Sequence, residues 1–131
     1  DEAIQMSREV LAGKKQLHGD KDQRTISSTN NLASSLAEAG QFDEALSTVR
    51  KLLPFARRVL GADHDVCLRL AHSYAYAVMN CAAASRDELI FAEKLHEDTV
   101  RRFRRVLGPA HPSTSKAEDD LFYLRECLAN L

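Results

Sequence analysis

An internal repeat limits the folds that this chain can adopt. Two landmarks, an alanine near the start of a predicted helix and a glycine after its end, each occur three times: Ala3, Ala45 and Ala92; Gly19, Gly61 and Gly108. In both sets the first interval is forty-two residues and the second is forty-seven. Because two independent landmarks give the same offsets, we expect a solenoid of stacked helix pairs with a five-residue insertion in the third copy.

The overall composition argues against several classes of protein. The 131 residues include 18 basic and 19 acidic side chains, for a formal net charge of −1, so bulk charge gives no reason to expect binding to nucleic acid or to an anionic membrane. No apolar run approaches the roughly 20 residues that a membrane-spanning helix needs, so we expect no membrane insertion. The three cysteines lack a Cys-x-x-Cys spacing, which favours reduced thiols and an intracellular, cytoplasmic location.

Apolar residues recur at steps of three and four along most of the chain, which predicts an all-α fold of about six amphipathic helices. We expect the helices to cover these residues: 1–17, 22–39, 41–60, 64–84, 85–107 and a last helix from 112. Short connections make each helix antiparallel to the one before it. The predicted architecture is therefore a right-handed α-solenoid of antiparallel helix pairs.

The repeat also predicts how the single domain, residues 1–131, is divided. We expect residues 1–19 to be the second helix of a preceding repeat, 20–61 a repeat, 62–108 a repeat with the insertion, and 109–131 a final helix of the first type. The first helix then lacks its own partner, so we expect its apolar residues to be only half covered: Ile4, Val10, Leu11 and Leu17. Near the other end we place these residues on the inward stripes: Val106, Leu107, Leu121, Phe122, Leu124 and Leu128.

Three local features refine the predicted helices. Pro54 lies inside the helix over 41–60, where we expect a kink near 49–53 because the apolar phase continues on both sides. The insertion falls at 81–86, and its three alanines predict that the preceding helix is lengthened by a turn. The run Ser85-Arg86-Asp87-Glu88 is a capping box that starts the next helix.

Short motifs recur in a fixed order along nearly the whole chain. They are Asn30-Asn31-Leu32-Ala33, then Gly40-Gln41-Phe42-Asp43-Glu44-Ala45, then the linkers Leu60-Gly61-Ala62-Asp63-His64 and Leu107-Gly108-Pro109-Ala110-His111-Pro112. Together they resemble the tetratricopeptide repeat, and more narrowly the 42-residue type found in kinesin light chains. The chain departs from the pattern where His72-Ser73 and Asp119-Asp120 stand in place of the paired asparagines. The resemblance implies protein binding and does not name the partner.

Candidate catalytic and metal sites are weak. His64 and Cys67 have an i, i+3 spacing with His72 further along, but a zinc site needs more ligands than this spacing supplies, so we interpret His64 as a linker residue and Cys67 as a core residue. His96-Glu97 lacks the second histidine of a zinc protease motif. Asp119 and Asp120 are adjacent on a helix and point in different directions. We expect no enzyme activity, no metal and no cofactor.

The basic run Arg101-Arg102-Phe103-Arg104-Arg105, together with Arg57-Arg58, raises the alternative of a nucleic-acid surface. We favour a solvated helix face, because cations near a helix C-terminus are stabilised by the helix dipole. Phe103 belongs to the buried stripe and is therefore not available to stack on bases. With a net charge near zero, we expect no nucleic-acid partner.

A concave groove is the remaining candidate site. The first helices of successive pairs line the concave face, and residues off the buried stripe form three rows there: Ser27, Asn30 and Ser34, with Asn31 beside them; Arg69, His72 and Tyr76; Lys116, Asp119 and Tyr123. We expect Asn30 to hold a peptide backbone, the two tyrosines to pack an apolar side chain, and Arg69 with Lys116 to bind carboxylates. The negative charge of Asp119 would repel the carboxylates of such a ligand.

Two functional hypotheses remain open. In the first, the chain is a non-catalytic interaction module of a larger scaffold and binds a protein or peptide with acidic and hydrophobic residues in its groove. In the second, it is a structural assembly subunit or spacer that uses its convex face or its ends. The sequence leaves the oligomeric state open.

Overall fold

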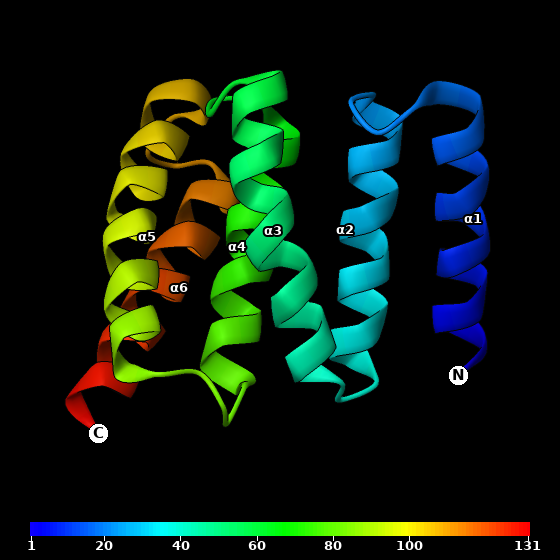
Figure 1. Cartoon of the computed structure of the whole chain (residues 1–131). Coiled ribbons are helices and arrows are strands. Elements are labelled where there is room, and N and C mark those ends of the chain that lie inside the picture. The colour runs from blue at the N-terminus through cyan, green and yellow to red at the C-terminus, as the bar shows by residue number, and fades with distance from the viewer.

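The computed structural model describes residues 1–131, and it is all-helical, as the sequence predicts. Its six helices are α1 (Glu2–His18), α2 (Gln23–Glu38), α3 (Phe42–Leu60), α4 (Asp65–Asn80), α5 (Arg86–Leu107) and α6 (Pro112–Ala129). Figure 1 shows them side by side, from α1 at the N-terminal end to α5 and α6 at the C-terminal end. The predicted number, type and order of elements are confirmed.

The helices form two layers. Helices that follow one another in the chain pack together, and α4 also contacts α2 and α6, so α2, α4 and α6 form one layer. In the other layer, α1, α3 and α5 do not pack directly and are linked by ion pairs. These pairs are Arg8–Glu44 at 2.7 Å, Arg50–Glu88 at 2.5 Å and Arg57–Asp98 at 3.0 Å. The two layers thus differ: α4 contacts α2 and α6 directly, whereas ion pairs bridge α1, α3 and α5.

The repeated linkers switch the chain from one helix to the next. Gly61 and Gly108 follow α3 and α5 with φ of 94° and 95°, a backbone conformation that side chains with a Cβ rarely adopt. Three residues later, His64 and His111 cap α4 and α6: each Nδ1 accepts a hydrogen bond from the backbone N–H two residues on, at 3.1 and 3.0 Å. The glycine ends one helix and the histidine starts the next.

The five-residue insertion does not lengthen α4, so that prediction is wrong. Helix α4 ends at Asn80, and Cys81 has an extended backbone with φ −92° and ψ 112°. The thiol of Cys81 donates a hydrogen bond to Oδ1 of Asp43 at 2.9 Å, and the side chain is buried. This anchor to the start of α3 outweighs the helix propensity of the three alanines, which form a turn instead. Only half of the predicted capping box forms: Ser85 Oγ accepts from the backbone N–H of Glu88 at 3.1 Å, whereas the Glu88 carboxylate binds Arg50 and Tyr74 instead of reaching back to Ser85.

Helix α3 continues through Pro54, as expected, and its axis changes direction along its length in Figure 1. The apolar stripe keeps its phase through the proline: Val49, Leu53 and Ala56 are all at most 5% exposed. They belong to the central core of the molecule, which combines residues of α2 to α6.

The stripes at the two ends are less covered. In α1, Ile4 is buried and Leu11 is half-buried, whereas Val10 and Leu17 are exposed, in agreement with the expected half-covered helix. At the other end the placement of Phe122, Val106 and Leu107 inward is wrong, since all three are exposed. Phe122 is turned about 100° around α6 from the buried Leu121, which takes it off the packed face.

Candidate functional site: a polar groove across three helices

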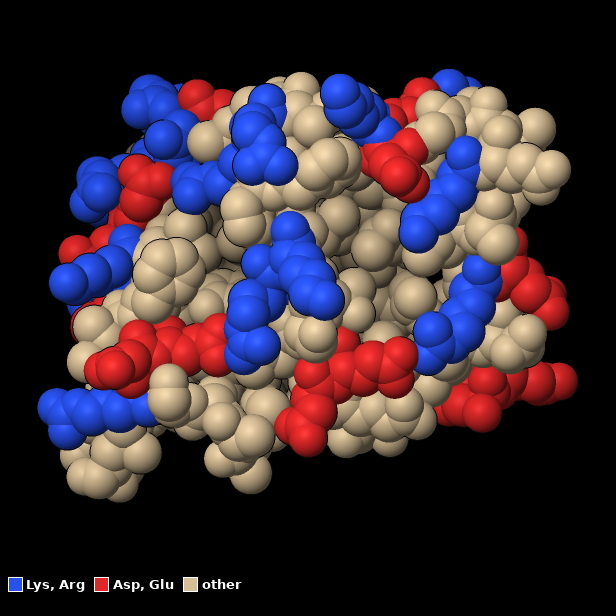
Figure 2. Space-filling model, viewed as in Figure 1, with Lys and Arg blue, Asp and Glu red and all other residues tan.

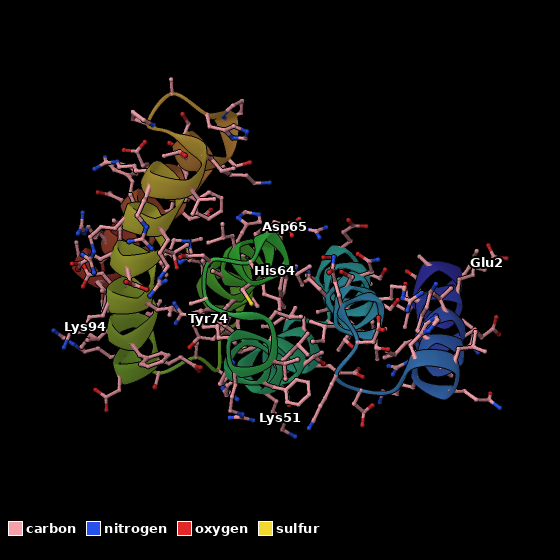
Figure 3. The ribbon with its side chains drawn as sticks, turned by 90° about the horizontal axis from the view of Figure 1, so that it is seen from above. Glu2, Lys51, His64, Asp65, Tyr74 and Lys94 are labelled. Atoms are coloured by element: carbon pink, nitrogen blue, oxygen red, sulfur yellow. The ribbon has the colours of Figure 1, made fainter.

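A polar groove with a volume of about 400 Å³ crosses α2, α4 and α6. Six of the ten residues predicted from the sequence line it: Asn30, Asn31, Ser34, Arg69, His72 and Lys116. Side chains of α5, among them His96, complete its wall. Figure 3, seen from above, shows α5 and α6 set at an angle to the row of α1 to α4, with Asp65 on the inner side of this angle. The structure therefore brings together residues that are far apart in the sequence.

The remaining predicted residues lie beside the groove or outside it. Tyr76 lines an adjoining hollow of about 240 Å³, which shares Ser34 and His72 with the groove, and its ring meets Phe42 at a centroid distance of 6.0 Å. Ser27 is half-buried and lines neither hollow. Asp119 and Tyr123 are exposed and also lie outside both. The predicted opposing carboxylate of Asp119 is therefore outside the groove, but that of the neighbouring Asp120 lines it together with Arg69 and Lys116.

Asn30 carries an unsatisfied polar atom into this groove. The residue is only 8% exposed, and its Oδ1 has no hydrogen-bond partner in the protein. A buried amide oxygen without a partner costs about 1–3 kcal/mol, so a donor that reached Oδ1 from the groove would recover this cost. A peptide N–H is one such donor.

The two cations of the groove differ in their surroundings. The guanidinium of Arg69 lies 3.6 Å from the carboxylate of Asp65 on the same helix, and both side chains are well exposed. Lys116 of α6 is exposed and makes no ion pair. Because an exposed i, i+4 pair is weak, Arg69 remains able to bind another carboxylate.

Sequence reasoning missed a buried polar cluster next to the groove. Nδ1 of His72 lies 2.5 Å from Oδ2 of Asp120, and Nε2 of His96 lies 3.5 Å from the same oxygen. Burial would raise the pKa of Asp120, but its contacts with His72 and His96 outweigh burial and hold this pKa below its usual value. The carboxylate is therefore ionised at neutral pH.

A signal for this cluster was present in the sequence. Asp120 lies three residues after Ala117 and four before Leu124, so it shares the buried side of α6 with them. The sequence interpretation placed Asp119 in the groove and gave Asp120 and His96 no role. Of the two carboxylates, Asp120 is the one that points inward.

The geometry supports neither a metal site nor a membrane-spanning helix. His64 lies in the linker and Cys67 is buried in the core, as interpreted from the sequence, and His64 also caps α4. No group of three or more His, Cys, Asp or Glu side chains is placed to hold a metal ion. None of the helices combines the length and the apolar character that a membrane crossing requires.

Acidic partners accompany the basic run of α5. Arg102 and Arg105 bind Asp63 at 2.8 and 3.0 Å, and Arg101 lies 3.6 Å from Asp98. Arg104 pairs with a carboxylate of α6. Figure 2 shows basic and acidic side chains interleaved over this upper end of α5. Such a mixed surface is unlike the single-sign patch that binds nucleic acid.

Comparison with known proteins adds one finding. A family model described as tetratricopeptide repeat matches residues 25–65 and 81–113, together more than half of the chain. The first match covers α2 and α3, and the second covers α5 with its flanking turns. Most of α4, including Arg69 and His72, lies between the two matches. No curated protein matches the sequence.

Proposed function

The chain belongs to the tetratricopeptide repeat family, whose repeats generally mediate protein–protein interactions and are non-catalytic, and we propose that its groove across α2, α4 and α6 binds a peptide segment of a partner protein. In this proposal the chain is an interaction module of a larger scaffold. The observation that carries the proposal is the unpartnered Oδ1 of Asn30 inside a polar groove that also contains Arg69 and Lys116.

The same residues define the chemistry of the ligand. Asn30 supports binding of an extended backbone through a peptide N–H. Arg69 and Lys116, which come from neighbouring helices of one layer, support binding of carboxylate side chains. Tyr76, beside Phe42 in the adjoining hollow, provides an apolar contact. The proposed ligand is therefore a segment with both acidic and hydrophobic residues.

A double charge reversal tests this proposal. An array of synthetic peptides carrying Leu or Phe with one to three Asp or Glu residues is probed with the chain, alongside a matched array with Asn and Gln. We expect the wild type to retain acidic peptides, and Arg69→Glu with Lys116→Glu to lose about tenfold or more in affinity, from two charge-assisted contacts of about 0.5–1.5 kcal/mol each. Circular dichroism checks the fold.

The matched control carries the same change in net charge away from the groove. Lys51 and Lys94 are exposed, lie on α3 and α5 and point outward in Figure 3. We expect Lys51→Glu with Lys94→Glu to bind like the wild type. Equal losses in both double variants would show a general charge effect and would contradict the groove proposal.

A specific feature favours the second candidate, a structural assembly role for the convex face. A hollow of about 230 Å³ lies between α3 and α5, lined by Leu53, Pro54 and Leu95, with Arg50 and Arg57 at the rim. Phe91 also lines it and is 60% exposed. If binding to a partner survives the groove reversal and is lost in Phe91→Ser, this face replaces the groove as the binding surface.

A further inference from the structure

The cluster of two imidazoles and one carboxylate opens onto the groove through His72. The side chain of Asp120 is 10% exposed and that of His96 is 1% exposed, whereas that of His72 is 33% exposed. His72 also lines both the groove and the adjoining hollow. Of the three residues, His72 is the one placed to touch a ligand.

The carboxylate determines which nitrogen of His72 carries the proton. An ionised carboxylate only accepts hydrogen bonds, so at 2.5 Å the Nδ1 of His72 must be the donor to Oδ2 of Asp120. A neutral imidazole has a single N–H. The Nε2 of neutral His72, which forms no hydrogen bond within the protein, is therefore left as an acceptor toward the groove.

We propose that Nε2 of His72 is a proton-switched hydrogen-bonding position of the groove. In the neutral ring it accepts a hydrogen bond, and when the ring gains a second proton it becomes a positively charged donor. Histidine is the side chain whose charge ordinarily changes near neutral pH, and the carboxylate of Asp120 lies behind the ring, at Nδ1. The switch follows from the position of one buried carboxylate.

The consequence for binding rests on the proposed function. A ligand carboxylate near Nε2 meets a lone pair above neutral pH and an N–H donor below it. Affinity for an acidic segment therefore rises on acidification, and binding takes up a proton by linkage. A segment whose carboxylates are replaced by amides lacks most of this dependence.

Other ionisable groups face His72 from each of the surrounding helices. Helix α2 contributes Glu38 in the adjoining hollow, α4 contributes Arg69 with its neighbour Asp65, and α6 contributes Lys116 as well as Asp120. Carboxyl, ammonium and guanidinium groups ordinarily titrate outside pH 6–8. Helix α5 contributes His96, a second imidazole in the wall of the groove, whose side chain is only 1% exposed.

The first experiment needs no ligand. Long-range proton–nitrogen NMR spectra of the ¹⁵N-labelled chain assign the protonated nitrogen of each imidazole. We expect the neutral ring of His72 to carry its proton on Nδ1, and the acidified ring to carry protons on both nitrogens. In Asp120→Asn the anion that fixes the tautomer is lost, so the Nε2–H form appears in the neutral ring. A wild-type His72 with its neutral-state proton on Nε2 would overturn the proposal, whether or not Asp120→Asn folds.

The second experiment uses a fluorescein-labelled acidic peptide without histidine, selected from the array, and its Glu→Gln counterpart. We expect the acidic peptide to bind the wild type about twofold to fivefold more tightly at pH 6 than at pH 8, the range for a partly exposed charge pair. His72→Gln should remove this difference, and His96→Gln should retain most of it. An unchanged pH dependence in His72→Gln would refute the coupling. If no array peptide binds at either pH, the proposed function fails, while the NMR result still decides the protonation of His72.

Discussion

At the scale of single residues, α2 carries buried apolar residues on one side and groove-lining residues on the other. Leu32 of α2 and Leu46 of α3 are 6% and 2% exposed and belong to different apolar clusters. Ser34 lies two residues after Leu32, borders the groove and is half-buried. A helix turns about 100° per residue, so positions two apart face opposite ways. Apolar packing is thus concentrated on one side of α2, and the side chains that line the groove lie on the other.

Substitutions to alanine should reveal this division. We expect Leu32→Ala and Leu46→Ala each to lower the free energy of unfolding by about 2–5 kcal/mol, because each leaves a cavity in packed surroundings. Ser34→Ala should cost well under about 1 kcal/mol, since its hydroxyl borders solvent. Urea denaturation midpoints measure the three values. Similar losses for Ser34→Ala and Leu32→Ala would contradict the assignment of the two sides.

Most groove residues could be predicted because helical spacing fixes their direction once one buried stripe is known. Asn30, Ser34, Arg69 and His72 follow from the strong stripes of α2 and α4. The apolar stripe of α6 is weaker. The spacing from Ala117 and Leu124 places Asp120, of the two adjacent aspartates, on the buried side of α6. The rotation of α6 against α4 is set by tertiary packing, so the contact of Asp120 with His72 does not follow from local spacing.

At the scale of elements, the linkers need glycine because of its backbone conformation. Lack of room for a side chain is not the reason. Gly61 has φ 94° and ψ 145°, a region that is almost restricted to glycine. Gly13 lies inside α1 with ordinary helical backbone. A Cβ placed on either residue would meet no atom within 4 Å. The two positions therefore differ in conformation alone.

Replacing each glycine with alanine should shift stability in opposite directions. We expect Gly61→Ala to cost about 1–3 kcal/mol through backbone strain, and Gly13→Ala to add about 0.5–1 kcal/mol by removing the entropy that glycine loses in a helix. Thermal denaturation followed by circular dichroism compares both with the wild type. A stabilising Gly61→Ala would show that the linker adopts a different backbone in solution.

Element boundaries illustrate what local sequence decides and what it does not. Capping residues and glycines locate the starts of α4, α5 and α6 because these signals act within a few residues. The end of α4 depends on a bond from Cys81 to Asp43, thirty-eight residues earlier in the chain. Three alanines favour a helix locally, but this distant contact determines the turn.

At the scale of the whole molecule, ionised carboxylates hold successive helices together. Glu88 joins α5 to α3, Asp98 lies between α3 and α5, and Asp120 lies between α4, α5 and α6. The hydrogen bonds from Arg50 and Tyr74 outweigh burial and lower the pKa of Glu88. Burial would raise the pKa of Asp98, but the hydrogen bonds from Arg102 and Arg57 lower it by more, so this pKa is also below its usual value. The C-terminal half of the array thus depends on acids that remain charged.

This arrangement predicts loss of stability in acid. A carboxyl group whose pKa is lowered by folding contributes its full stabilisation above its unfolded value, which is 3.8 for aspartate, and loses it as the pH falls through the lower folded value. We therefore expect urea midpoints to change little for these groups between about pH 7 and 5 and to fall steeply below about pH 4. Asp120→Asn cannot ionise, so its midpoint should be lower at neutral pH and decline less toward pH 3. The exposed Asp119→Asn, one residue away, is the matched control and should follow the wild type. Parallel acid profiles for Asp120→Asn and the wild type would mean that the buried carboxylate does not couple α6 to α4 and α5.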